Sequence, residues 1–307
     1  MPNATRRGSF DSTEGVRIAW REDGPPPQSE GATGFFWLSG FKSDMCGTKA
    51  EAIAAHAAAA GRPCLRFDYS GHGESGGDFA EGSISRWLGE AATAFTTRAT
   101  GRRIVIGSSM GGWLALLLLR RLQTSDPAAA ARLRGIILIA PAVDMTKALM
   151  WDRYSEEVRQ MMTEQGFYLK PSLYGPEPYL YTRKLIEDGR GHLFLEDGLD
   201  IPCPLRILQG DSDPDVPYEH ALRTFHAVRG TDIRLTLVKG GDHRLSSPGD
   251  IALLLDTVEA LARQSDNESN RQIGSRQSAV PCSTAGRLTS AQSPAEDEAQ
   301  GCSGKGK

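Results

Sequence analysis

The sequence predicts an α/β protein whose doubly wound, mostly parallel sheet carries a helical cap insertion. Three observations support this: short apolar runs alternate with helical patterns, several runs are apolar at consecutive residues, and one long interval has no strand pattern. Strands buried on both faces of a parallel sheet are apolar throughout, whereas a half-buried strand alternates. The alternation of strands with helices favours a sheet that has helices on both faces.

The predicted strands are rich in β-branched or aromatic residues and lie at residues 16–20, 34–38, 63–69, 103–106, 135–139, 205–208 and 233–238. The predicted helices lie at residues 48–60, 84–99, 110–122, 218–228 and 249–262. Two of these helices begin with a pattern similar to a capping box, in which a Ser or Thr and an acidic residue three positions later bond each other's backbone N–H groups. The two pairs are Thr48 with Glu51 and Ser247 with Asp250.

One domain is expected over residues 8–264, and its cap insertion is expected at about residues 144–200. The insertion combines helix-like pieces with many Met, Tyr, Trp and Phe residues, which could line a lid or simply cover the sheet. Residues 265–307 are rich in Ser, Gln, Asn, Gly and Glu and show no apolar periodicity. We expect this C-terminal tail to be disordered, because it cannot bury enough apolar surface.

Composition limits the possible partners of the chain. The 307 residues carry a formal net charge of −3, so no excess of positive charge recruits nucleic acid. No apolar run approaches the ~20 residues of a membrane helix, so stable membrane insertion is not expected. The first 21 residues contain four arginines, Asp11 and Glu14 but no apolar signal core. We therefore expect a cytoplasmic protein.

The cysteines give no sign of a disulfide framework or a zinc site. They are five in number and widely spaced, without a C-x-x-C pair or a histidine group nearby: Cys46, Cys64, Cys203, Cys282 and Cys302. We expect neither a metal nor an organic cofactor.

Ser109 is the predicted nucleophile. The pattern G-x-S-x-G occurs twice, around Ser109 and around Ser75, and only context separates the two. A nucleophile elbow needs a buried strand that leads directly into a sharp turn and a helix. The strand at 103–106 and the helix from residue 110 give Ser109 this setting, whereas Ser75 lies in a glycine-rich loop. We therefore expect Ser75 to be structural.

A serine hydroxyl needs a base within hydrogen-bond reach and a third group that orients the base. His243 follows the last predicted strand, where the base is expected. His72, in the loop that contains Ser75, remains a rival. The other histidines lie in predicted helices or in the insertion.

The third group is predicted from the acidic loop that follows the strand at 205–208. Asp213 is favoured because it matches the pattern G-x-x-D-x-x-V-P, and Asp215 remains possible. The stabilisation of an oxyanion further requires two backbone N–H groups. Met110 N–H at the start of a helix and Phe41 N–H, after the strand at 34–38, are the candidates, although Phe41 could merely be an apolar wall.

Four sequence motifs of this chain resemble those of a family of serine esterases. The family is typified by the mitochondrial palmitoyl-protein thioesterase that is also an acyl-glucuronide esterase, and it includes bacterial relatives. The motifs lie at residues 47–50, 66–75, 107–113 and 241–244, and the likeness spans about residues 35–262. The resemblance implies the α/β-hydrolase fold and a triad of Ser109, Asp213 and His243. It also implies hydrolysis of acyl thioesters and oxygen esters, including S-palmitoyl-cysteine and acyl glucuronides. Two departures from the family are the denser acidic string at 211–215 and the lack of a visible mitochondrial presequence.

These observations predict a serine hydrolase that acts through an acyl-enzyme on small-molecule acyl esters or acylated proteins. One alternative is a cofactor-free perhydrolase or haloperoxidase, which shares Gly-x-Ser-Met-Gly. A peptidase is disfavoured because no accessory region resembling a propeller is visible. A catalytically inactive scaffold, binding a partner through the aromatic insertion, is an alternative from another class. The Met and aromatic content of the insertion favours acyl chains of medium or long length.

Overall fold

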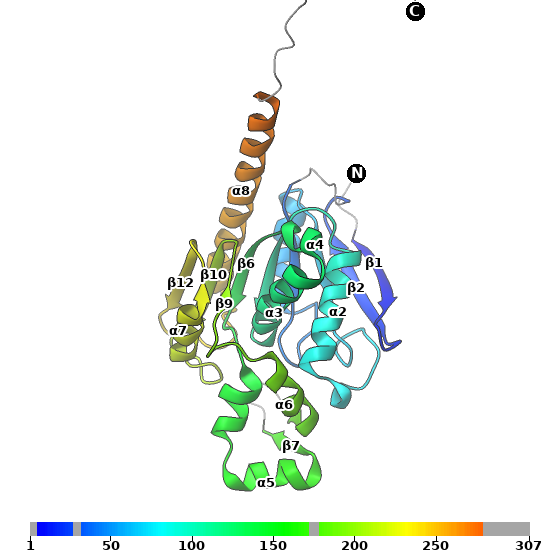
Figure 1. The fold of residues 1–307 in the computed structure, drawn as a ribbon, viewed down its shortest axis with the longest axis vertical. Helices are drawn as coiled ribbons and strands as arrows, with labels where there is room; N and C mark the ends of the chain where they lie inside the picture. The colour runs from blue at the N-terminus through cyan, green and yellow to red at the C-terminus, as the bar shows by residue number, and fades with distance from the viewer. Residues whose placement is uncertain (1–4, 27–31, 172–177, 279–307) are drawn as a thin grey trace, which may run out of the picture. The chain divides into compact units, whose positions relative to one another are not determined.

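A sheet of eight strands forms the centre of the fold, in the order β1-β2-β4-β3-β5-β6-β10-β12 (Figure 1). The computed structural model describes residues 5–26, 32–171 and 178–278, and the chain divides into the units Met1–Ser269 and Asn270–Lys307. The strands of this sheet are β1 Arg6–Asp11, β2 Arg17–Asp23, β3 Gly34–Leu38, β4 Cys64–Phe67, β5 Arg103–Ser108, β6 Leu133–Ile139, β10 Leu205–Gly210 and β12 Ile233–Val238.

The sheet is mostly parallel, which confirms the predicted fold class. β2 runs antiparallel to both β1 and β4, and every other neighbouring pair is parallel. All seven predicted strands are present. β1 was not predicted, because this edge strand is polar and mostly exposed and so carries no apolar run.

Helices cover both faces of the sheet. The helices of the domain are α1 Thr48–Ala59, α2 Ile84–Thr97, α3 Met110–Ser125, α4 Pro127–Arg132, α7 Tyr218–Ala227 and α8 Pro248–Ser278. Successive side chains of β3 point to opposite faces. Phe36 and Leu38 join the apolar core beneath α2 and α3, and Phe35 and Trp37 join the core beneath α1 and α8. This double burial explains why the central strands are continuously apolar.

The insertion between β6 and β10 forms a cap, most of whose labelled elements gather at one end of the domain in Figure 1. Its elements are η2 Thr146–Met150, η3 Trp151–Arg153, α5 Glu156–Gln165, β7 Phe167–Lys170, β8 Tyr179–Thr182, α6 Arg183–Gly189, η4 Arg190–His192 and β9 Leu199–Asp200. The antiparallel pair β7–β8 was not predicted. Each of these strands has only four residues, and the sequence analysis assigned their aromatic side chains to the helix-like insertion.

One of the two predicted capping boxes is present. The Ser247 N–H donates to Asp250 Oδ2 over 3.0 Å, and the Asp250 N–H donates to Ser247 Oγ over 3.2 Å. The other is wrong, because Gly47 is the residue that precedes α1 and no side chain caps this helix. Glu51 instead accepts a hydrogen bond of 2.7 Å from Arg66 Nη1.

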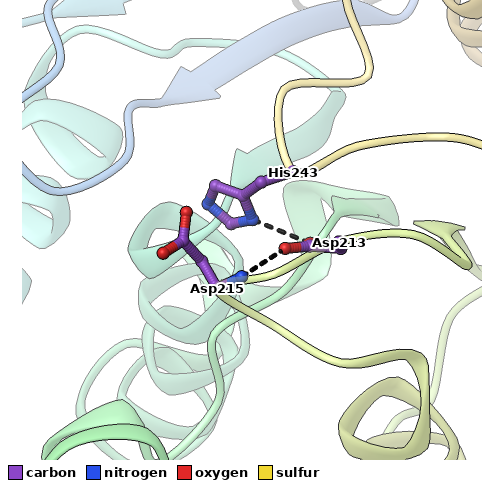
Figure 2. Close-up of side chains that lie close together, drawn as sticks. All are labelled: Asp213, Asp215 and His243. Atoms are coloured by element: carbon purple, nitrogen blue, oxygen red, sulfur yellow. Dashed lines mark hydrogen bonds and ion pairs between the residues drawn. The ribbon is translucent and has the colours of Figure 1, made fainter. Parts of the chain in front are cut away.

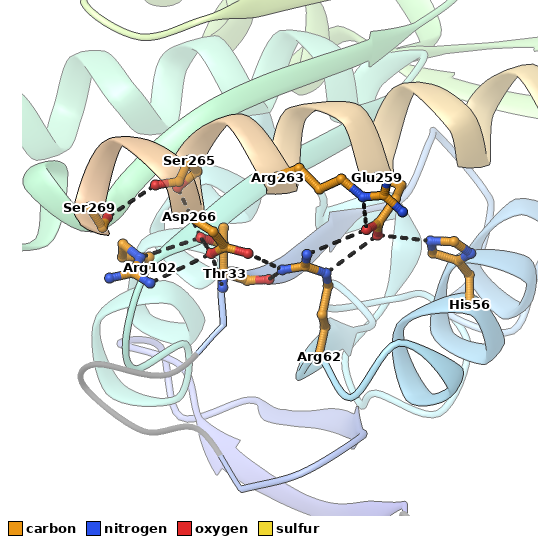
Figure 3. A network of polar contacts seen from close by, with 9 residues as sticks. All are labelled: Thr33, His56, Arg62, Arg102, Glu259, Arg263, Ser265, Asp266 and Ser269. Carbon is orange, nitrogen blue, oxygen red and sulfur yellow. Dashed lines mark hydrogen bonds and ion pairs between the residues drawn. The ribbon is translucent and has the colours of Figure 1, made fainter. Parts of the chain in front are cut away.

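Helix α8 continues past residue 265, where the disordered tail was expected to begin. Figure 3 shows the polar contacts that hold this part of α8 on the domain. Asp266 accepts from the Thr33 N–H over 2.9 Å, from Thr33 Oγ1 over 2.7 Å and from Arg62 Nη1 over 2.8 Å. Composition did not reveal these long-range bonds. Residues 279–307 lie outside the described part of the chain.

Although α8 has 31 residues, the described part of the chain contains no helix that is both long enough and apolar enough to cross a membrane.

Candidate active site

Ser109 forms the sharp turn between β5 and α3. The strand ends at Ser108 and the helix begins at Met110, so Ser109 alone reverses the chain, with φ 54° and ψ −118°. Positive φ is unfavourable for a residue with a side chain and is typical of a nucleophile elbow. Gly111 is needed beside it, because a Cβ atom there would lie 2.1 Å from the Leu38 carbonyl oxygen. The turn places half-buried Ser109 in the wall of a cavity.

His243 links Ser109 to Asp213. Its Nε2 lies 3.1 Å from Ser109 Oγ, and its Nδ1 lies 2.8 Å from Asp213 Oδ2. A carboxylate oxygen can only accept, so Nδ1 carries the proton and donates it. The lone pair of Nε2 is then free to accept the Ser109 hydroxyl proton. The three side chains come from separate loops, 134 and 30 residues apart along the chain from His243.

All acceptor positions of the Asp213 carboxylate are occupied. Oδ1 accepts from the N–H groups of Asp215 and Val216, each over 2.9 Å, and Oδ2 accepts from His243 and, over 3.1 Å, from Gln209 Nε2. The side chain of Asp213 is fully buried, so these bonds replace its lost hydration. Gln209 was missed by the sequence analysis. It is a buried polar residue at the end of a strand, and that position was a usable signal.

Asp215 lies beside the same imidazole but does not replace Asp213. Figure 2 shows Asp213 bonded both to His243 and to the backbone of Asp215. Asp215 Oδ1 lies 3.9 Å from Lys170 Nζ. The three acidic and imidazole groups are close enough to suggest a metal site. The hydrogen bonds of Asp213 leave it no free lone pair for a metal, so this cluster is better explained by proton positioning.

The other serine and histidine candidates lie in structural contacts. Ser75 Oγ donates to the Asp68 carbonyl oxygen over 2.7 Å and accepts from the Ala19 N–H over 2.8 Å. His72 is buried, and its Nε2 accepts from the Lys42 N–H over 3.2 Å. Neither residue is bonded to Ser109 or Asp213 in the described part of the chain.

The two backbone groups expected to stabilise an oxyanion flank Ser109. Among the described residues, neither the Phe41 N–H nor the Met110 N–H donates a hydrogen bond to the backbone or to a side chain. Met110 is the first residue of α3, where N–H groups have no partner within the helix. Gly40 brings the other loop close, because a Cβ atom on Gly40 would lie 3.3 Å from Ser109 Cβ.

Ser109 and His243 open into a cavity of about 950 Å³ between the sheet and the cap. The cap supplies apolar and aromatic lining, including Met145, Leu149, Met150, Val158, Tyr168 and Tyr181. Basic side chains outnumber acidic ones in the lining. The basic residues are Lys42, Lys49, Arg153, Lys170 and Arg244, and the acidic residues are Asp44 and Asp215. A chain with a net negative charge thus has a cavity with a positive lining.

Lys49, on the first turn of α1, holds the loop that carries His243. Its Nζ donates to the Arg244 carbonyl oxygen and, over 3.3 Å, to Ser246 Oγ. Burial lowers the pKa of Lys49 to about 8, so this ammonium group is held in an environment that disfavours its charge.

Comparison of the chain with known proteins identifies an alpha/beta hydrolase family model and related thioesterases. A family model described as "Alpha/beta hydrolase family" matches residues 31–252. The human protein "Palmitoyl-protein thioesterase ABHD10, mitochondrial" is 32% identical over 229 residues, which cover 74% of this chain and 72% of the relative. The orangutan (Pongo abelii) protein of the same name is also 32% identical over 229 residues, with the same coverage.

Two solved structures are similar along nearly their whole length. A protein from Agrobacterium vitis S4 has a TM-score of 0.80 and 40% identity, covering 85% of this chain and 100% of its own. The mouse alpha/beta hydrolase domain-containing protein 10 has a TM-score of 0.74 and 27% identity, covering 84% and 99%.

Proposed function

Because the chain belongs to the alpha/beta hydrolase family, we propose that it is a serine hydrolase that cleaves carboxylic thioesters or esters through an acyl-enzyme. A single observation carries the proposal: the hydroxyl of Ser109, the imidazole of His243 and the carboxylate of Asp213 form one continuous chain of hydrogen bonds at the wall of a large cavity. This arrangement activates a serine for attack on a carbonyl carbon.

In the acylation step, Ser109 Oγ attacks the carbonyl carbon of the substrate while His243 Nε2 takes the hydroxyl proton. Asp213 keeps the proton of the imidazole on Nδ1 and stabilises the imidazolium. The N–H groups of Phe41 and Met110 hold the oxyanion of the tetrahedral intermediate. His243 then donates its proton to the departing thiol or alcohol, which leaves the acyl group on Ser109.

In the deacylation step, water attacks the acyl-enzyme. His243 Nε2 takes a proton from the water, the second tetrahedral intermediate forms in the same oxyanion site, and its collapse returns the proton to Ser109 Oγ. The carboxylic acid product is released and the starting state is restored. Every proton transfer in this cycle uses the protein's own side chains, so the proposal requires no metal or organic cofactor.

The cap determines which acyl groups fit. Its Met, Leu, Val and Tyr side chains line the cavity next to Ser109, and an alkyl chain placed there would lose contact with water. We assign the substrates to acylated proteins or small acyl esters with medium or long chains. The name of the human relative, a palmitoyl-protein thioesterase, describes a substrate of this class.

A second substrate class is favoured by Arg153. This arginine lines the cavity from the cap, and within the described residues its guanidinium has no hydrogen bond or ion pair. Together with Lys170 it offers a site for an anionic group on the substrate. Acyl glucuronides, in which the acyl group is esterified to the anomeric oxygen of a sugar that carries a free carboxylate, meet this requirement.

Labelling with a fluorophosphonate probe tests the proposal most directly. We expect stoichiometric labelling at Ser109 and the turnover of p-nitrophenyl and acyl-CoA esters across a range of chain lengths. An inactive scaffold would show no labelling. A perhydrolase would form peracid from acetate and peroxide faster than it hydrolyses esters, so the same preparation separates the alternatives.

A cytoplasmic location remains a prediction. The named relatives are mitochondrial by name, and fractionation of the source cells with an antibody against this chain tests the location.

A further inference from the structure

His72 is a buried histidine that contacts the backbone next to Phe41 and that the proposed mechanism does not use. It lies in the glycine-rich loop after β4, and its side chain is only 4% exposed. Nδ1 lies 3.0 Å from the Ser70 carbonyl oxygen, and Nε2 lies 3.2 Å from the Lys42 backbone nitrogen. Since a carbonyl oxygen can only accept, Nδ1 carries the proton, and Nε2 accepts from the Lys42 N–H.

The Lys42 N–H belongs to the peptide that directly follows Phe41, whose own N–H is the proposed oxyanion donor. Lys42 has φ 57°, a conformation that is unfavourable for a residue with a side chain. An acceptor on this N–H therefore offsets local strain and fixes the plane of the Phe41–Lys42 peptide. Burial lowers the pKa of His72, which favours the neutral ring that this bonding requires.

The side chain of Phe41 is held by the same aromatic group that encloses His72. The Phe41 ring lies 4.9 Å from the Phe79 ring and 5.9 Å from the Trp87 ring, and the His72 ring lies 5.1 Å and 5.2 Å from these same two rings. His72 thus holds the backbone after Phe41 while the shared aromatic rings hold its side chain. The backbone before Phe41 packs against Ser109 through Gly40.

We propose that His72 is a positioning residue for the oxyanion site: by accepting the Lys42 N–H, its Nε2 fixes the orientation in which the Phe41 N–H faces the reacting carbonyl. His72 does not touch the substrate. The inference rests on the proposed hydrolase function, since it assigns a task within that reaction. The hydrogen bond between Lys42 and His72 joins the loop after β3 to the glycine-rich loop after β4, and the two residues are 30 positions apart along the chain.

Three substitutions separate the possible roles of this side chain. In H72Q, the amide oxygen takes the place of Nε2 and can accept from Lys42. In H72N, the amide takes the place of Nδ1 and can donate to Ser70 but cannot reach Lys42. H72F keeps the ring and its aromatic packing but has no acceptor.

The experiment measures kcat and KM for a p-nitrophenyl ester, and the affinity of a trifluoromethyl ketone, whose adduct with serine carries an oxyanion. We expect H72F and H72N to lower kcat by about 10- to 100-fold, which is less than the ~10²- to 10³-fold loss of a whole oxyanion donor. The affinity for the ketone should fall by the same factor while KM changes by less than about threefold. H72Q should keep kcat within about fivefold of the wild type.

Wild-type kcat in H72F would overturn the proposal in favour of packing alone, and wild-type kcat in H72N would overturn it in favour of the bond to Ser70. Replacement of the residue-42 amide by an ester, through an α-hydroxy acid, removes the N–H while His72 stays in place. This ester variant should match the loss of kcat in H72F, and unchanged kcat in it would also overturn the proposal. It decides the question even where a His72 variant does not fold.

Fluorophosphonate labelling of the wild type separates failure of the role proposed for His72 from failure of the hydrolase proposal. If wild-type Ser109 is labelled and esters are turned over, but the variants equal the wild type, only the role of His72 fails. If the wild type is neither labelled nor active, the hydrolase proposal itself fails.

Discussion

His243 Nδ1 lies 2.8 Å from Asp213 Oδ2, whereas Asp215 of the same loop lines the cavity instead. We therefore expect D213N to lower kcat for esters by about 10⁴-fold, as loss of the orienting carboxylate does in serine proteases. D215N keeps the volume of its side chain and serves as the matched control, with kcat expected within about tenfold of the wild type. A larger loss in D215N than in D213N would reverse the assignment of the acid.

Ser109 and Ser75 occupy the two matches to G-x-S-x-G, but their surroundings differ. S109A should abolish probe labelling and lower kcat by about 10⁶-fold if the three side chains act as a unit. S75A should remain labelled, because Ser75 Oγ bonds only backbone groups. It should instead lower the free energy of unfolding by about 1–2 kcal/mol, measured by urea denaturation. Loss of labelling in S75A would contradict this division.

Arg153 should affect substrates according to their charge. We expect R153Q to lower kcat/KM for an acyl glucuronide by about 10-fold or more, since a charged hydrogen bond to the sugar carboxylate is lost. Turnover of a p-nitrophenyl ester with the same acyl group should change little. R183Q, another cap arginine, which pairs with Glu187 outside the cavity lining, is the control. Equal losses on both substrates would remove the argument for an anion site.

The burial of His220 should make the folded protein less stable at acid pH. Its buried imidazole bonds the Val143 carbonyl oxygen over 2.7 Å, and burial lowers its pKa to about 4. In the unfolded chain, the imidazole of this residue has a pKa near 6.5. As the pH falls, the unfolded chain therefore binds this proton before the folded chain does. The stability associated with His220 is full above pH 6.5 and is lost progressively toward pH 4, by about 3 kcal/mol at the acid limit.

H220Q should therefore show a smaller fall in unfolding free energy between pH 6.5 and pH 4 than the wild type does. Urea denaturation at several pH values measures this slope. H226Q, in the same helix but with an exposed side chain, should keep the wild-type slope. Parallel curves for H220Q and the wild type would show that His220 does not contribute.

Asp266 should hold α8 on the domain. D266A leaves the fully buried Thr33 without acceptors for its N–H and removes one ion-pair partner from Arg62. We expect the free energy of unfolding to fall by about 2–4 kcal/mol, because a buried donor loses its partner. D200A, which breaks the exposed pair with Arg229, should leave the denaturation midpoint almost unchanged. The reverse order of these two effects would contradict the role given to Asp266.

The central sheet could be predicted because strands that are buried on both faces are apolar at consecutive residues of the sequence. Ser109 and His243 were chosen for a related reason, since each follows a predicted strand and the two parallel strands end at the same edge of the sheet. β1 could not be predicted, because an exposed edge strand needs few apolar residues. β7 and β8 have four residues each and could not be separated from the aromatic-rich insertion around them.

Contacts between distant segments could not be predicted from local pattern. The bond from Lys42 to His72 and the bonds from Thr33 to Asp266 join residues 30 and 233 positions apart. Glu51 shows the same limit, because its partner Arg66 is reached only when α1 packs against the sheet. The prediction of a capping box at Thr48 and Glu51 was wrong for this reason. Glu51 accepts from Arg66 rather than from a backbone N–H group at the start of its own helix.

Helix α8 comes after every strand of the sheet, and its Leu254, Val258 and Leu261 share a core with Phe35 and Trp37. While the chain is still being synthesised, all eight strands and α1 leave the ribosome before α8, the second helix that covers this face of the sheet. The nascent protein must therefore expose the part of the apolar face that α8 covers to solvent or to a chaperone until α8 is made. Its greatest risk of aggregation falls during translation, and a mutation that delays the docking of α8 should lower the yield of protein more than the activity of the molecules that fold.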